Sequence, residues 1–244
     1  REAQGNVVGS LDNGTFFDRL VKSRAITASI GTCGIDSSYA LVHKVAMDFS
    51  AKSADEADRA PKPATPTWGA VIVSDTGELT WNRERPGKAY WTVDTPNTKL
   101  FSGFPEGREI ALSGVKLAIG QTRLGWATVS LTSRHATGFG ADGKPATILL
   151  TATGVSENEG TQFETYPGGS AALRDRTHWG EGTVLVEGVP AVVTLPSPAA
   201  KTHCYALDER GARQGDVPVE NVAGGCRVAI GPQYKTVWYE LEIR

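Results

Sequence analysis

Residues 70–104 read AVIVSDTGELTWNRERPGKAYWTVDTPNTKLFSGF, and this stretch decides the fold class. Four short apolar runs are separated by DTGE, RPGK and TPNT, which are rich in the residues that form tight turns. Short strands that recur every 8–12 residues or so, with turn residues between them, are typical of β-sandwiches and barrels. The stretch therefore predicts successive strands joined by tight turns.

Side chains alternate between two faces within the predicted strands. In residues 89–94 (AYWTVD), Tyr90 falls on one face and Trp91 on the other. In residues 236–243 (TVWYELEI), Trp238 shares its face with the two glutamates and not with the apolar residues. Each of these strands is therefore expected to have one face toward a core and one face away from it.

The same alternation of short apolar runs and turn residues continues to the C-terminus. The further segments are GWATVSLTS (125–133), ATILLTATGV (146–155), TVLVEGV (183–189), AVVTL (191–195), THCYALD (202–208), CRVAI (226–230) and TVWYELEI (236–243). We therefore predict an all-β fold, a jelly-roll-like β-sandwich, with a β-solenoid or a barrel as alternatives. The absence of a repeat of fixed period argues against the solenoid.

One polar stretch, residues 51–67 (AKSADEADRAPKPATPT), is the clearest internal boundary. It is rich in proline and has no apolar pattern, which is typical of an extended connector. The preceding residues include a strand-like segment at 39–49 (YALVHKVAMDF) but are too few for a separate core. We predict that residues 1–67 are a strap and connector packing on a main domain of residues 68–244.

Charge and hydropathy exclude several classes of protein. The 25 Lys and Arg nearly balance the 27 Asp and Glu, and they are scattered singly, so nucleic acid is not an expected partner. No apolar run reaches the ~18 residues that span a bilayer, so no membrane association is expected. The opening REAQGN is not a signal peptide, and the chain is interpreted as a mature or excised one.

No catalytic constellation is evident. Glycoside hydrolysis needs two carboxylates flanking the bond, and the candidates are Glu157, Glu159, Glu164 and Asp94. The three glutamates lie in or near polar loop segments, and Asp94 opens a turn in which it is expected to accept backbone N–H bonds. A GxSxG elbow is absent. We therefore expect no enzymatic activity.

No metal or cofactor site is expected from the histidines and cysteines. The four histidines are well separated, and no CxxC occurs. The pattern still leaves room for a structural calcium held by backbone carbonyls and an Asp. Cys204 and Cys226 lie in strands that could be neighbours, so a disulfide with Cys33 free is one interpretation and two buried thiols the other.

Aromatic side chains give the main functional signal. Trp179 lies in RDRTHWGEG (174–182), among Arg174, Asp175 and His178, where a core tryptophan would be out of place. Rings of this kind stack on the flat faces of sugars while polar neighbours bond the hydroxyls. The loop is the predicted binding site.

The other aromatic residues belong either to the binding site or to the core. Tyr166, in FETYPGG (163–169), resembles Trp179 and is assigned to the same site. Trp81 and Tyr90 lie on predicted strands and are candidates for the site. For both of them, and for Trp91, a position in the core is the favoured interpretation. Trp126 and Trp238 are predicted to be in the core.

Several segments together resemble a known kind of region. They are SDTGELTW (74–81), WTVDTPNTKLFSGF (91–104), ILLTATGVSENEG (148–160), VLVEGVPAVV (184–193), CYALDERG (204–211) and KTVWYELEI (235–243). In this order they resemble a β-rich accessory region near the C-terminus of large bacterial glycoside hydrolases. The most specific element is the DTPxTx motif at Asp94–Lys99, and the resemblance runs from about Tyr39 to the end.

The resemblance implies a secreted, non-catalytic carbohydrate-binding module that targets a glycoside hydrolase to a polysaccharide. Its partners would be that polysaccharide and the catalytic domain of the same parent enzyme. The alternatives are a structural domain that buttresses a catalytic barrel and, less favoured, a glycoside hydrolase or lyase in its own right. The Gly-rich loop at residues 133–150 departs from the resemblance, which gives no residues for sugar contact.

Overall fold

The computed structural model describes residues 41–43, 67–84, 87–135, 138–141, 143–165, 171–173 and 179–244. The chain divides into two compact units, Glu2–Trp81 and Asn82–Arg244. Most of the predicted strap and connector, residues 1–67, lies outside the described residues, so that division of the chain stays a prediction.

The first unit contains β1 (Val71–Val73) and the start of β2 (Leu79–Asn82). The turn between these strands is closed by Ser74, whose backbone N–H donates to the carbonyl of Leu79 at 2.9 Å and whose Oγ accepts the N–H of Leu79 at 3.0 Å. Residues 41–43 form a turn, so the predicted strand at 39–49 is wrong at these three positions. There the carbonyl of Val42 accepts a hydrogen bond from the backbone N–H of Asp75.

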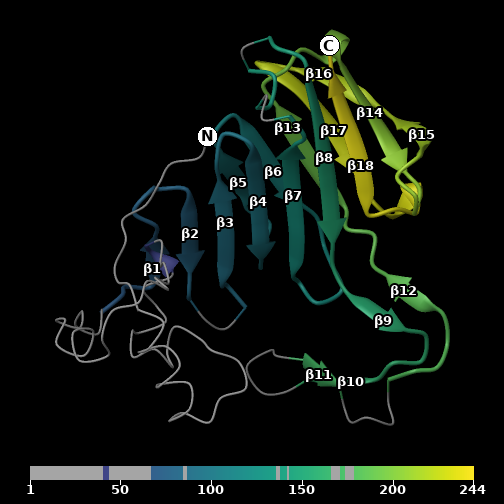
Figure 1. Cartoon of the computed structure of the whole chain (residues 1–244). Helices are drawn as coiled ribbons and strands as arrows, with labels where there is room; N and C mark the ends of the chain where they lie inside the picture. The colour runs from purple at the N-terminus through teal and green to yellow at the C-terminus, as the bar shows by residue number, and fades with distance from the viewer. Residues whose placement is uncertain are drawn as a thin grey trace, which may run out of the picture. The chain divides into compact units, whose positions relative to one another are not determined.

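The second unit is a β-sandwich, which confirms the predicted fold class. Within this unit the larger sheet has the strand order β3-β4-β7-β8-β18-β14-β15, and its neighbouring strands are antiparallel. Its strands are β3 (Tyr90–Asp94), β4 (Thr98–Gly103), β7 (Ala127–Ser133), β8 (Ala146–Thr153), β18 (Trp238–Ile243), β14 (Thr202–Leu207) and β15 (Arg213–Val217). Figure 1 shows β3, β4, β7 and β8 side by side.

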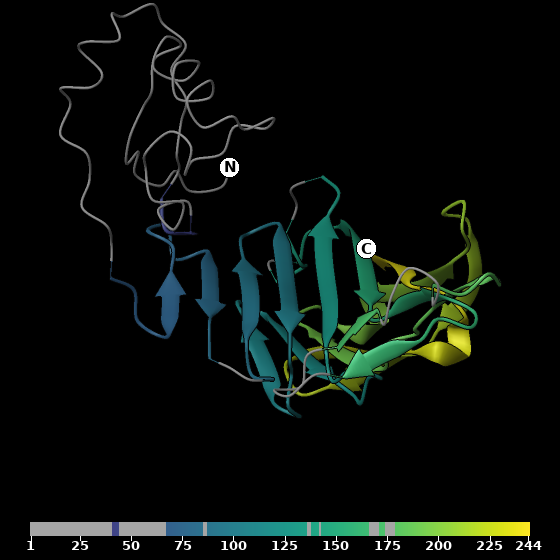
Figure 2. The same ribbon diagram turned by 90° about the horizontal axis from the view of Figure 1, so that it is seen from below.

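The smaller sheet has five antiparallel strands in the order β16-β17-β13-β6-β5. They are β16 (Val219–Val222), β17 (Gly225–Ile230), β13 (Ala191–Leu195), β6 (Val115–Ile119) and β5 (Glu109–Leu112). Only short 3-10 turns, Ala199–Lys201 and Pro232–Tyr234, interrupt the strands in this part of the described chain. Figures 1 and 2 both show the green and yellow C-terminal strands gathered on one side of the sandwich, away from β3.

Between β8 and β13 the chain extends into an arm made of two small antiparallel pairs. Its strands are β9 (Ser156–Asn158), β10 (Phe163–Thr165), β11 (Ala171–Leu173) and β12 (Val184–Val186). β9 pairs with β12, and β10 pairs with β11 farther out. Figure 1 draws this arm below the sandwich. The arm is therefore an extension of the large sheet's longest strand.

The core lies between the two sheets and follows the alternation of the sequence. β7, β8 and β6 each bury every second residue, so that Leu131, Ile148 and Leu117 are fully enclosed while their neighbours point outward. The buried cluster runs from Phe101 to Ile243 and draws on both sheets. Because a strand side chain alternates with period two, only one face of each sheet enters this core.

The two described cysteines are free thiols, so the interpretation of a Cys204–Cys226 disulfide is wrong. They do not lie on neighbouring strands of one sheet, because Cys204 is on β14 of the large sheet and Cys226 on β17 of the small one. Burial, with a further contribution from Cys226, raises the pKa of Cys204 to about 12. Burial also raises the pKa of Cys226. Both groups therefore stay protonated at neutral pH, and Cys33 lies outside the described residues.

Candidate functional site

The outer face of the large sheet carries two tryptophans with a band of small hydroxyl side chains between them. We call the whole surface, with both tryptophans and the residues between them, the hydroxyl face. It consists of Trp91, Val93, Leu100, Ser102, Thr128, Ser130, Thr151, Thr153 and Trp238. The strand register puts these residues on one face: Trp91 pairs with Ser102, Ser102 with Thr128 and Thr128 with Thr153. In the adjacent row, Trp238 pairs with Thr151.

Both tryptophans are exposed, which makes the core prediction wrong for each of them. Trp91 is 44% exposed and Trp238 is 41% exposed. The reason is the alternation itself, because their neighbours Thr92 and Tyr239 take the inward positions. Trp126, also predicted to be core, is only half-buried. Large rings left exposed on a regular strand face are candidates for ligand contact.

The hydroxyls between the tryptophans are paired across strands. Ser102 Oγ lies 2.8 Å from Thr128 Oγ1, and Ser130 Oγ lies 2.7 Å from Thr151 Oγ1. Each pair uses one O–H as donor and one lone pair as acceptor, which leaves one O–H and several lone pairs per pair. The face therefore offers both donors and acceptors at fixed positions.

Charged residues bound the hydroxyl face on the side of β14 and β15. Arg213 bonds Glu240 and Glu242, and its guanidinium lies 3.9 Å from the centre of the Tyr205 ring. Hydrogen bonds from Arg244, followed by those from Arg213, hold the pKa of Glu242 below its usual value. Both carboxylates are therefore paired with guanidinium groups.

A pocket of about 490 Å³ opens beside Trp238 at the start of β18. Its lining includes the apolar Val184 and Val186 of the arm. It also includes Asp208 and Lys235, but Asp208 already accepts the backbone N–H groups of its own turn. Because Trp238 belongs both to the pocket and to the hydroxyl face, the two surfaces are continuous at this ring.

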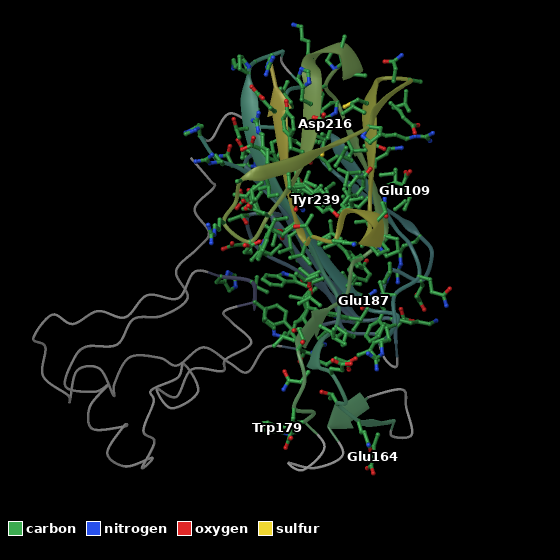
Figure 3. The ribbon with its side chains drawn as sticks, turned by 90° about the vertical axis from the view of Figure 1, so that its right-hand side faces the viewer. Glu109, Glu164, Trp179, Glu187, Asp216 and Tyr239 are labelled. Atoms are coloured by element: carbon green, nitrogen blue, oxygen red, sulfur yellow. The ribbon has the colours of Figure 1, made fainter. Side chains whose placement is uncertain are left out.

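The structure places Trp179 on the arm and not on the large sheet that carries the hydroxyl face. Figure 3 shows Trp179 and Glu164 at the outer end of the arm, with Glu187 between them and Tyr239. The backbone carbonyl of Trp179 accepts a hydrogen bond from Thr161 Oγ1 at 2.7 Å, while the residue is 53% exposed. Its backbone is thus anchored and its ring is outside the core.

Of the remaining predicted site residues, the structure describes Trp81 and Tyr90. Tyr166, Arg174, Asp175 and His178 lie outside the described residues. Trp81, half-buried on β2, belongs to the first unit. Tyr90 stacks on Phe101 with ring centres 5.8 Å apart, and the Arg108 guanidinium lies 4.8 Å from its ring centre. The role of all these residues in a site stays a prediction, although the contacts of Tyr90 are those of a packing side chain.

Two of the four candidate carboxylates are held in ion pairs. Glu157 on β9 bonds Arg123. Asp94 bonds Lys99, which is buried on the inner face of β4. Glu159 and Glu164 are exposed on the arm. Among the described residues, no group of three or more His, Cys, Asp or Glu side chains is placed to hold a metal ion.

Comparisons with known proteins found no match to the chain among family models, curated proteins or solved structures. Within the described part, no helix has the length and apolar character to cross a membrane.

Sequence reasoning missed the hydroxyl face although the signal was present. The alternation in AYWTVD and TVWYELEI separates Trp91 from Tyr90 and Trp238 from Tyr239. What was missing is that β3 and β18 belong to one sheet with β4, β7 and β8 between them. Only that order puts the two tryptophans on a common surface.

Proposed function

We propose that this chain is a non-catalytic carbohydrate-binding module whose hydroxyl face holds a polysaccharide. The observation that carries the proposal is the pair Trp91 and Trp238, exposed on one face of a hydrogen-bonded sheet with paired hydroxyls between them. The C–H faces of sugar rings stack on indole, and their hydroxyls exchange hydrogen bonds with Ser and Thr side chains. In this proposal the module is secreted and holds a glycoside hydrolase at its polysaccharide.

The state of the carboxylates supports binding without cleavage. A general acid and a nucleophile or base must both face the scissile bond. Asp94 and Glu157 instead face cationic partners, Lys99 and Arg123. The hydroxyl face itself, as defined above, contains no carboxylate.

Binding to soluble β-glucans, xylans and mannans, measured by affinity gel electrophoresis and calorimetry, tests the proposal. If stacking on indole resembles base–aromatic stacking, each ring contributes about 1–3 kcal/mol, so Trp91→Ala and Trp238→Ala should each weaken binding about tenfold or more. The matched control is Val192→Ala, on the outer face of the smaller sheet, which should bind as the wild type does. Retardation by none of the polysaccharides, or retardation unchanged in both tryptophan variants, would contradict the proposal.

The same titration tests the site predicted on the arm. Trp179→Ala should weaken binding about tenfold, on the same stacking estimate, if the arm extends the binding surface. Unchanged affinity in this variant, with affinity lost in the hydroxyl-face variants, would restrict the site to the sheet.

A second candidate function is a structural domain that packs on the catalytic barrel of a parent enzyme. The observation that favours it is β12, where Val184, Leu185 and Val186 are all exposed. Three consecutive exposed apolar residues are typical of a surface that contacts another protein. Failure of the wild-type chain to bind any polysaccharide in the panel would favour this candidate over carbohydrate binding.

A further inference from the structure

The distance between the two tryptophans follows from the strand register. Trp91 on β3 and Trp238 on β18 are separated by three strands, β4, β7 and β8. On β8, Thr153 is the residue in register with Trp91, through Ser102 and Thr128, and Thr151 is the residue that pairs with Trp238. Four strand spacings and an offset of two residues along the strands put the two side chains roughly 20 Å apart. Several linked sugar rings are needed to cover this distance, and a disaccharide cannot touch both indoles.

The surface between the two indoles is uncharged. Its side chains are the two hydroxyl pairs, Thr153 and the apolar Val93 and Leu100. The first charged residues along this part of the sheet are Glu240 and Glu242, and Arg213 pairs with both. A charged polymer would lose hydration over the neutral band without gaining an unpaired partner there.

The geometry points to a linear, uncharged polysaccharide that crosses the strands of the large sheet and stacks on Trp91 and Trp238 at the same time. This inference rests on the proposed function. Contact at the first ring raises the effective concentration of the rest of the chain at the second, so the two stacking positions reinforce each other only when one chain reaches both. Affinity should therefore depend steeply on chain length up to that span and weakly beyond it.

Calorimetric titration with cello-, xylo- and manno-oligosaccharides, from disaccharide to octasaccharide, tests the inference on the intact chain. For the preferred series, affinity should rise by about tenfold or more between the disaccharide and the shortest oligomer that spans both rings. Trp91→Ala and Trp238→Ala should each remove that rise. Trp91→Tyr and Trp238→Tyr should restore part of it, and unchanged melting temperatures would show that the variants are folded.

A comparison of charged and neutral polymers of matched length tests the second half of the inference. Polygalacturonate and a carboxymethylated glucan should bind more weakly than a neutral polymer of similar length. A disaccharide that reaches full affinity, loss of the length dependence in only one tryptophan variant, or preference for the charged polymers would overturn the inference and leave the proposed function standing. Binding to no carbohydrate at all would overturn both.

Discussion

At the scale of single residues, the most consequential contact is between Asp94 and Lys99. The Lys99 side chain is 4% exposed, and its Nζ donates to Asp94 Oδ1 at 2.5 Å and to the carbonyl of Thr95 at 2.7 Å. Asp94 Oδ2 also accepts the backbone N–H and the hydroxyl of Ser113, both at 2.9 Å. Because Ser113 follows β5 of the small sheet, this carboxylate joins the two sheets at one end of the sandwich. Asp94 was expected to accept the backbone N–H bonds of the turn that follows it. Thr95 does so instead, because its Oγ1 accepts the N–H groups of Asn97 and Thr98.

Removing the charge of Asp94 should destabilise the sandwich more than removing that of Lys99. Asp94→Asn leaves a buried ammonium without its counter-ion, and we expect the free energy of unfolding to fall by about 2–3 kcal/mol. That is below the 3–5 kcal/mol of a fully buried pair, because Asp94 is 27% exposed. Lys99→Met removes the buried charge and leaves Asp94 its bonds to Ser113, so it should cost less. Equilibrium urea unfolding at neutral pH measures both losses, and a larger loss for Lys99→Met would contradict this account.

The same contact predicts an acid dependence. Burial alone would raise the pKa of Asp94, but hydrogen bonds from Lys99 and Ser113 outweigh it and hold the pKa below its usual value. The stabilisation is therefore complete above the unfolded-state pKa and is lost as the pH falls through the lower pKa of the folded state. Asp94→Asn should flatten this part of the stability curve. An identical acid slope in wild type and variant would show that Asp94 is not the titrating group.

At the scale of elements, the arm and the sandwich are stabilised differently. Central strands of the sandwich such as β7 and β8 bury alternate side chains, whereas all three residues of β12 are exposed. One tight turn of the arm depends on glycine: Gly180 has φ of +71°, and a Cβ at this position would lie 2.4 Å from the carbonyl oxygen of Glu159. The arm is therefore an element whose local stability can change without a change in the core.

Two neighbouring substitutions should separate these properties. Gly180→Ala introduces a clash at positive φ, so hydrogen exchange in β9 and β12 should become faster while the melting temperature of the sandwich changes little. Trp179→Ala removes only an exposed ring, so its stability should stay within about 0.5 kcal/mol of the wild type. A large drop in melting temperature for Trp179→Ala would mean that this ring packs against the fold.

At the scale of the whole molecule, the core described here belongs to the second unit. Its buried cluster runs from Phe101 to Ile243 and includes residues of both sheets. A sandwich of this size can bury enough apolar surface to fold without disulfides, and its two described cysteines are free.

A chain without residues 1–67 should therefore retain one cooperative thermal transition, followed by circular dichroism. The positive control is Leu117→Ala, which empties a fully buried position and should cost about 2–5 kcal/mol. Loss of cooperativity in the shortened chain would show that the removed residues, 1–67, complete the core.

The sequence by itself determined the fold class, the positions of most strands in the described part, and the face on which each strand side chain lies. These properties are local, because turn residues and a period of two are set by neighbouring residues. Thus Tyr239 and Trp238 were assigned to opposite faces correctly, as were Tyr90 and Trp91.

Tertiary structure decided which of those faces is covered and which strands are neighbours. The pairing of Trp238 with Thr151 joins residues far apart in the chain, and no local pattern specifies it. The same long-range order puts Cys204 and Cys226 on different sheets and brings Trp91 and Trp238 to one surface. The physical reason is that burial depends on the packing of two whole sheets, which is a property of distant contacts and not of the local sequence.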